Sequence, residues 1–409
     1  MRNFLNYFMV IVTLLIVFSI SVYFNALNIL LIILFNIILL AAVNKYFSDL
    51  LLVFLMILHY ILYLFSLYLH KYVLISLSPG SDALRFEQLA YNFYREYAFN
   101  EEANIFQSST AYSRLIGSIY YLGKDYIVIP GLINITAHSI SIVLIYMIFK
   151  QVFNTQKGIY MTILIFILYP IGMITTVTSL RESLITMFIL LFTVFVLKYV
   201  QSNRIEFLLG SIITLIIGSL FHIGVISLIY IVIFCMIFIN KRKNLFATLS
   251  AILLSIVSFV LITTSENSKI SAALNSNNEN LNANDARADY LTSYSGSGLS
   301  SIIDYRLPQI FYFFTKPFPW EISTVQDIVG FINVFVILTG LFLSIYIYIK
   351  KKNQKILTVI LIVMIIYFTY ALGTSNYGTA LRHRDKISIL IVMFWPYYYY
   401  FRRTINRNV

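Results

Sequence analysis

Long apolar stretches alternate along this chain with short polar segments and with two long polar ones. An apolar stretch of about 20 residues is long enough to cross the hydrocarbon core of a bilayer as a helix. The pattern predicts membrane-spanning helices over residues 4–24, 27–43, 49–70, 127–149, 158–178, 181–200, 206–220, 223–240, 245–263, 327–349, 355–373 and 387–401. We therefore expect an all-α polytopic membrane protein of about twelve helices, with one integral membrane domain over residues 1–409.

The composition supports this interpretation. The chain is 60% hydrophobic and only 11% charged, whereas soluble domains contain about 25% charged residues. The formal net charge of +12 is therefore interpreted by the side of the membrane, and no nucleic-acid partner is expected. The single cysteine, Cys235, lies inside an apolar stretch, so no disulfide can form within the chain.

The charges divide unevenly between the two sides of the predicted membrane. An even number of spans places both termini on one side, together with 16 of the 29 Lys and Arg and 2 of the 17 Asp and Glu. That side carries a net charge of +14, and the other side, with 13 cations and 15 anions, carries −2. Since Lys and Arg gather in short cytoplasmic loops, both termini are predicted to be cytoplasmic.

Two long loops, residues 71–126 and 264–326, then lie on the outer face with almost all of the acidic residues. This distribution favours binding or chemistry on that face. The first loop contains SPGSDALRFEQLAYNFYREYAF, in which apolar and charged residues mix as in an amphipathic helix on a membrane surface. Ser81 or Asp82 can cap its start. Asp82, Arg85 and, more loosely, Glu87 share part of one helix face, although solvated charges on an interfacial helix explain them equally well.

The second loop divides into two parts. Residues 265–300 are rich in Asn and Ser and are predicted to be mobile, so that they can close over a substrate. Residues 301–321 are aromatic and contain Arg306. Their rings suit either a membrane-interface belt or stacking against sugars.

Two further candidates lie where predicted spans begin on the outer side. The stretch TSLRESLITM puts Arg181 and Glu182 at such a start, where ionisable groups are costly unless they face a polar cavity or each other. Glu182 can instead complement the helix dipole, and Arg181 can extend to the lipid headgroups. His222 lies between two spans and is either structural or catalytic. His59, His70 and His138 are interpreted as structural, and the histidines have no spacing typical of a zinc site.

The stretch NYGTALRHRDK, residues 376–386, is predicted to be an outer loop that carries Arg382, His383 and Arg384. Guanidinium groups bind phosphates through paired hydrogen bonds. We expect Arg181, Arg382 and Arg384, together with Arg306, to converge on an outward cavity that binds a phosphate or diphosphate. The alternative is ordinary binding to lipid headgroups.

Five motifs, in this order, resemble bacterial Wzy-type polysaccharide repeat-unit polymerases, including the EpsG-like branch. They are SDALRFEQLAYNFY, LRES, FHIGV, PFPWE and NYGTALRHR. The resemblance covers most of the chain from about residue 80 onward, and it does not extend to the first two spans or to residues 265–300. Each motif is weak alone, and their common order carries the resemblance.

The resemblance implies a GT-C-like glycosyltransferase in the bacterial cytoplasmic (inner) membrane, acting on its outer face without a cofactor. It would polymerise undecaprenyl-diphosphate-linked repeat units into O-antigen, capsule or exopolysaccharide. A chain-length regulator and a flippase are implied partners. Arg181, Arg382, Arg384 and Arg306 would bind the diphosphate, with Arg85 and His383 as secondary residues. Glu182, Asp82, Glu87 and His222 are the candidate bases, and no metal is expected.

Three other functions remain open. A transferase that takes one sugar from a polyprenyl monophosphate would use an early outer acid, a role open to Asp82. An O-antigen ligase has closely related chemistry. A flippase or transporter of lipid-linked glycans would show internal repeats and ionisable groups at mid-membrane, and neither is evident in the sequence.

Overall fold

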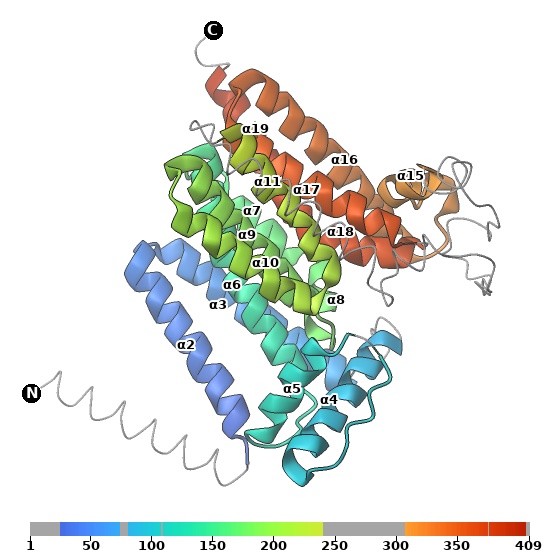
Figure 1. Cartoon of the computed structure of the whole chain (residues 1–409). Helices are drawn as coiled ribbons and strands as arrows, with labels where there is room; N and C mark the ends of the chain where they lie inside the picture. Colours follow the sequence, from blue (N-terminus) through green and yellow to red (C-terminus); the bar gives the residue numbers. More distant parts are fainter. Residues whose placement is uncertain (1–24, 74–80, 108, 240–306, 375, 406–409) are drawn as a thin grey trace, which may run out of the picture. The chain divides into compact units, whose positions relative to one another are not determined.

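The computed structural model describes residues 25–73, 81–107, 109–239, 307–374 and 376–405 (Figure 1). Within these ranges the regular secondary structure is helical, and none of their segments forms a β-strand. The prediction of an all-α protein is therefore confirmed. The residues form two compact units, one of Met1–Ile140 with Gly172–Ser183 (unit 1) and one of Ser141–Ile171 with Leu184–Val409 (unit 2).

Unit 1 contains α2 (Leu27–Phe47), α3 (Leu50–Tyr68), α4 (Ser81–Phe99), α5 (Ala111–Tyr121), the first half of α6 (Ile129–Phe153) and most of α8 (Pro170–Val177). The α3 helix begins where the Asp49 side chain accepts a hydrogen bond from the Leu52 amide at 3.1 Å. It ends in a π-helical turn, η1 (Leu69–Val73).

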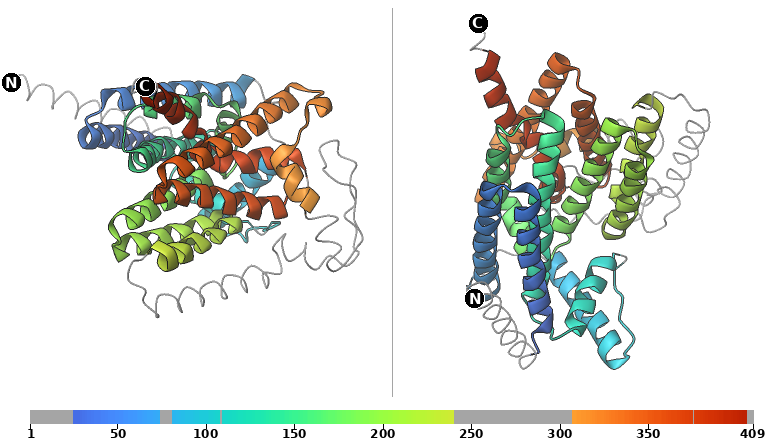
Figure 2. Two further views of the ribbon diagram at one scale, coloured as in Figure 1. Left: turned by 90° about the horizontal axis from the view of Figure 1, so that it is seen from above. Right: turned by 90° about the vertical axis from the view of Figure 1, so that its left-hand side faces the viewer.

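The α4 and α5 helices form a hairpin and lie side by side in both Figure 1 and the right-hand view of Figure 2. The α4 helix begins at Ser81, in the region where Ser81 or Asp82 was expected to cap a helix, and its buried face is made by Phe86, Leu89 and Phe93, whereas Leu84 is 65% exposed. Close packing explains the choice of face. A Cβ added at Gly117 of α5 would lie only 2.8 Å from the Ala90 carbonyl oxygen of α4. The sequence pattern did not reveal that α5 would cover this face.

Buried histidines join α3 to α6 within unit 1. His59 Nε2 lies 3.0 Å from His138 Nδ1, and the two rings stack with their centroids 4.9 Å apart. Ser139 Oγ lies 3.1 Å from His59 Nδ1, and Tyr63 Oη lies 3.4 Å from His138 Nε2. Hydrogen bonds of this kind hold helices together where lipid provides no hydrophobic driving force. This arrangement supports the structural interpretation of both histidines.

Unit 2 contains the rest of α6, together with α7 (Ile159–Leu168), α9 (Glu182–Ser202) from Leu184 onward, α10 (Ile205–Phe221), η3 (Ile223–Leu228), α11 (Ile229–Phe234), η4 (Cys235–Ile239), α15 (Leu307–Thr315), η6 (Pro319–Glu321), α16 (Val325–Lys351), α17 (Gln354–Leu372), α18 (Tyr377–Val392) and α19 (Phe394–Ile405). The α16, α17 and α18 helices are in mutual contact (Figure 1).

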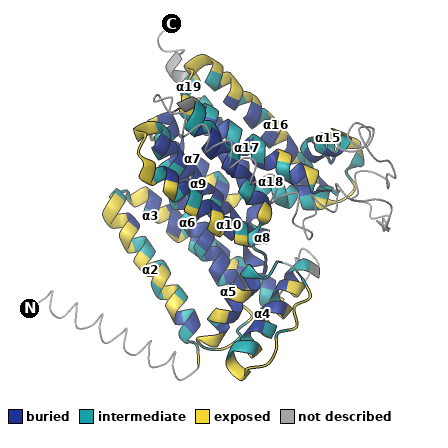
Figure 3. Ribbon diagram, in the orientation of Figure 1, coloured by how far each residue is buried: buried dark blue, intermediate teal, exposed yellow. Residues whose placement is uncertain are grey.

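Among the described residues, six helices are long and apolar enough to cross a membrane: α2, α3 with η1, α6, α9, α16 and α17. The α7 and α8 helices make a seventh span if they are counted together, with a bend of 56° at their break. All seven match predicted spans, and α10 and residues 223–237 are shorter apolar helices where two more were expected. The predicted spans 4–24 and 245–263 lie outside the described residues. Much of α2 is exposed (Figure 3). Its exposed side chains are largely apolar, as expected for a multi-pass membrane protein whose helices face lipid.

The last predicted span differs from the structure. The α18 helix begins at Tyr377, ten residues before the predicted span at 387, because the Asn376 side chain caps it by accepting from the Thr379 amide at 2.7 Å. The predicted outer loop is therefore helical. Arg384 and Lys386 are 0% and 1% exposed on this helix, so their charges are covered by protein.

Candidate active site

The site in unit 1 is built around the turn that joins α8 to α9. Asn134 of α6 is fully buried, and its amide nitrogen donates to the carbonyl oxygens of Thr178 and Leu180, both at 2.8 Å. Its amide oxygen accepts from the Tyr112 hydroxyl of α5 at 3.3 Å. The Asn134 side chain therefore fixes the turn to α6 and α5. Ser179 and Arg181 lie on this turn and are held in position by it.

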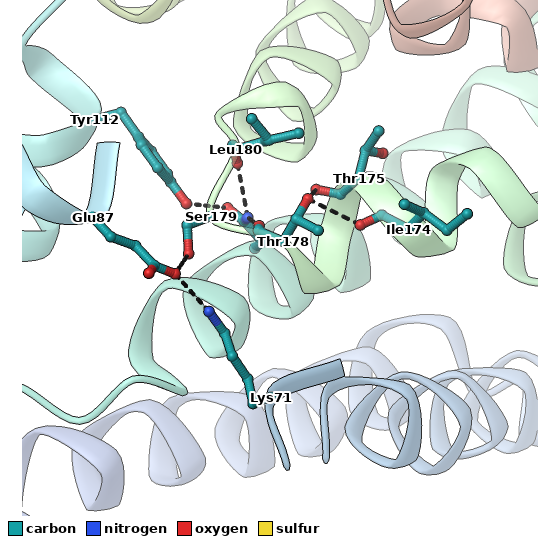
Figure 4. Close-up of polar contacts among 9 residues, drawn as sticks. Lys71, Glu87, Tyr112, Ile174, Thr175, Thr178, Ser179 and Leu180 are labelled. Carbon is teal, nitrogen blue, oxygen red and sulfur yellow. Dashed lines mark hydrogen bonds and ion pairs between the residues drawn. The ribbon is translucent and has the colours of Figure 1, made fainter. Parts of the chain in front are cut away.

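Glu87 of α4 meets two donors at this turn. Its Oε1 atom accepts from Lys71 Nζ at 2.5 Å and from the Ser179 hydroxyl (Figure 4). The Lys71 side chain is 10% exposed and that of Glu87 is 29% exposed. The carboxylate is therefore held in position by an ion pair and a hydrogen bond while part of it remains accessible.

Arg181 lies two residues beyond Ser179 on the same turn. Its guanidinium donates to the Ser109 hydroxyl and lies 5.4 Å from the centre of the Phe86 ring. Glu182 follows at the first position of α9 and is 7% exposed. A carboxylate there complements the positive end of the helix dipole.

The buried Tyr112 phenol lies within the field of both carboxylates. Burial raises its pKa well above its usual value of 10.0, and the charges of Glu182 and Glu87 act in the same direction, while the hydrogen bond to Asn134 opposes them. The phenol therefore stays protonated at neutral pH and serves as a donor to Asn134.

Unit 1 thus brings together two predicted bases, Glu87 and Glu182, and one predicted phosphate ligand, Arg181. A fixed carboxylate beside fixed cations can take a proton from a hydroxyl and stabilise an anionic leaving group. Asp82 lies in the first turn of α4, and Arg85 is exposed on the same helix.

Arg384, the best-buried of the predicted phosphate ligands in the described chain, lies in unit 2 against α15. Its Nη1 atom donates to the carbonyl oxygens of Phe313 and Lys316, at 3.0 and 3.2 Å. These carbonyls belong to the C-terminal end of α15, where the helix dipole favours a cation. The residue therefore holds α15 to α18.

A second cluster in unit 2 surrounds Tyr370 of α17. His383 stacks on its ring at 4.7 Å, and His222 lies edge-on at 4.9 Å. Lys386 Nζ lies 2.8 Å from His383 Nδ1. The His222 Nδ1 atom accepts from the Gly224 amide at 3.1 Å and so caps η3.

The structure divides the predicted site residues between the two units. Arg181, Glu182, Glu87, Asp82 and Arg85 belong to unit 1, and Arg382, His383, Arg384 and His222 belong to unit 2. The convergence of Arg181 with Arg382 and Arg384 stays a prediction. Arg306 lies outside the described residues.

Several residues of these clusters were not predicted as site residues, among them Lys71, Ser179, Asn134 and Lys386. Lys71 directly follows an apolar stretch, a position typical of a lysine at the lipid interface. Asn134 lies inside an apolar stretch, and a polar residue at such a position signals a buried polar contact. Within the described ranges no group of three or more His, Cys, Asp and Glu could hold a metal ion.

No protein-family model matches the chain, and no curated protein matches it either. Among solved structures, the crystal structure of ArnT from Cupriavidus metallidurans bound to undecaprenyl phosphate is similar, with a TM-score of 0.47 and 13% sequence identity. The alignment covers 83% of this chain and 59% of the ArnT chain.

Proposed function

We propose that this chain is a membrane glycosyltransferase that polymerises undecaprenyl-diphosphate-linked oligosaccharide repeat units on the outer face of a bacterial cytoplasmic membrane. The observation that carries the proposal is the cluster of Glu87, Lys71, Ser179 and Arg181. It supplies a partly accessible carboxylate and two cations next to one rigid turn. The order of the five motifs in the sequence supports the same function.

The acceptor half of the reaction needs a base. We assign this role to Glu87, which would accept the proton of an acceptor sugar hydroxyl as the oxygen attacks the anomeric carbon of the donor. A new carbon–oxygen bond forms, and the bond from the anomeric carbon to the diphosphate oxygen breaks. Lys71 and Ser179 hold the Glu87 carboxylate in place for this step.

The donor half needs cations. Undecaprenyl diphosphate leaves as a multiply charged anion, and fixed guanidinium groups lower the barrier by stabilising the charge as it develops. We assign Arg181 to this role and extend it to Arg382 and Arg384 of α18. Arg384 already donates to two carbonyls of α15, so Arg382 is the better test residue of this pair.

The test is the length of the product made by the full chain in nanodiscs, given one undecaprenyl-diphosphate-linked repeat unit. Wild type should give a ladder of longer lipid-linked glycans. Glu87→Gln, Arg181→Ala and Arg382→Ala should lower the rate at least 100-fold. The matched controls are Glu101→Gln, in an exposed ion pair with Arg95, and Arg204→Ala, exposed before α10. Both should keep the ladder.

Other outcomes identify the alternatives. Transfer of a single sugar from a polyprenyl monophosphate, without a ladder, would replace the polymerase by a single-sugar transferase. Transfer of glycan onto a lipid core would indicate a ligase. Movement of the intact lipid-linked glycan across the bilayer, with no covalent change, would indicate a flippase.

A further inference from the structure

A π-helical turn interrupts regular helical geometry where α3 ends. It covers Leu69–Val73 and carries His70 and Lys71 at consecutive positions. Such turns often occur at functional sites, because they redirect side chains that a regular helix would place elsewhere. Lys71 already belongs to the cluster around Glu87, and His70 was interpreted from the sequence as structural.

His70 is buried, with 7% of its surface exposed. Its Nδ1 atom is covered by protein and has no hydrogen-bond partner among the described residues. The buried polar atoms of folded proteins are almost always hydrogen-bonded, so an exception calls for an explanation such as a ligand contact. His59 and His138, by contrast, use both of their ring nitrogens in contacts with side chains.

The imidazole also lies within electrostatic reach of the candidate active site. The charged groups that act on it are Lys71 and Glu87, the two partners of the 2.5 Å ion pair. The uncommitted nitrogen of His70 therefore belongs to the surroundings of the proposed base.

We propose that His70 is a further binding residue of this site and that its Nδ1 atom hydrogen-bonds a hydroxyl of the acceptor sugar. The proposal rests on the proposed function. A hydroxyl both donates and accepts, so it satisfies Nδ1 in either tautomer of the ring, whereas a phosphate oxygen satisfies it only as N–H. Lys71, the next residue of η1, is the ion-pair partner of Glu87. This connection assigns the contact to the acceptor sugar, because Glu87 is the proposed base for that sugar.

The test compares His70→Asn with His70→Gln. The Asn amide reaches the position of Nδ1, and the longer Gln amide reaches that of Nε2. The acceptor is a repeat unit on a non-ionic lipid, which has no diphosphate leaving group and cannot act as donor. His70→Asn should keep the acceptor KM within about threefold, and His70→Gln should raise it about tenfold, the effect of one lost hydrogen bond. The kcat of both should stay within about twofold of wild type.

A second measurement uses the wild-type chain and does not depend on the folding of a variant. With ¹⁵N-labelled histidine, addition of the acceptor glycan should shift the His70 Nδ1 resonance, and inorganic phosphate alone should not. Equal acceptor KM values for both variants, or an unchanged resonance, would overturn the role of His70 while the polymerase activity stands. A wild-type chain that elongates no glycan would overturn the proposed function, and the role of His70 with it.

Discussion

Lys71 Nζ lies 2.5 Å from Glu87 Oε1 and so connects the end of α3 to α4. The two charges come from helices that the intervening residues 74–80 separate in sequence. This ion pair is largely covered, and removal of one partner leaves the other charge in a site shaped for both.

We expect Lys71→Met and Glu87→Gln each to lower the free energy of unfolding by about 1–3 kcal/mol. The double variant should lose less than the sum of the two, because neither charge is then left alone. Chemical unfolding of the four proteins in detergent measures this coupling. Additive losses would mean that the pair contributes nothing to stability.

Asn134 should affect activity through the turn that it holds. Asn134→Ala frees the carbonyls of Thr178 and Leu180, so Ser179 and Arg181 lose their fixed placement. We expect at least a tenfold loss of glycan elongation and a loss of about 1–3 kcal/mol in stability. Asn92→Ala, which removes an exposed hydrogen bond to the Asn104 carbonyl, is the control and should change neither quantity measurably.

Tyr112 gives the fold a specific sensitivity to alkali. Burial raises the pKa of its phenol above the usual 10.0, so above that pH the unfolded chain loses this proton first and unfolding becomes more favourable. The stability of wild type should therefore fall with rising pH by up to about 1.4 kcal/mol per pH unit more than that of Tyr112→Phe. Thermal unfolding at pH 9 to 11 tests this difference, and parallel pH profiles for the two proteins would contradict it.

Arg384 should stabilise the folded protein, in addition to any contact that it makes with substrate. Arg384→Leu leaves the Phe313 and Lys316 carbonyls at the end of α15 without their donor and should cost about 2–4 kcal/mol. Arg382→Leu, on a partly exposed position of the same helix, should cost less than about 1 kcal/mol. Thermal melts of the two variants in one detergent compare them directly. Similar losses would show that the contact with α15 contributes little.

The His59–His138 contact makes a prediction about coupling inside the membrane. His59→Leu places an apolar group against His138 Nδ1 and should cost about 1–3 kcal/mol. The double variant His59→Leu with His138→Leu should recover part of that loss, because the unmatched polar atoms are removed together. Chemical unfolding of the single and double variants in detergent measures these free energies. A double variant less stable than the sum of the single ones would refute this account.

The hydrophobic pattern predicts spans well because length and apolarity are nearly sufficient conditions for a membrane helix. The pattern fails at α18. Arg384 and Lys386 lie inside this helix, whereas a span predicted from apolarity excludes charged residues and therefore begins after them. Their charges are tolerated because α15 and His383 provide partners, and such tertiary compensation leaves no periodic signal in the sequence. The α4–α5 hairpin escaped prediction for the same reason, since the pattern alone did not show which helix would cover Phe86 and Phe93.

The candidate site was predictable in its residue types and less so in its partners. In the sequence, Arg181 stands out as a charge at the start of a predicted span, and Glu87 as a charge on a predicted amphipathic helix. Lys71, Ser179 and Asn134 join them only through contacts across 16 to 92 positions of sequence, and a single sequence does not reveal such pairings.

The turn between α8 and α9 also constrains how this protein can diverge. Ser179 and Arg181 face polar partners, while Leu180 between them is 1% exposed. An insertion or deletion of one residue here would exchange the buried leucine with a polar neighbour and remove both contacts at once. Descendants of this gene should therefore tolerate substitutions in the turn more readily than any change in its length.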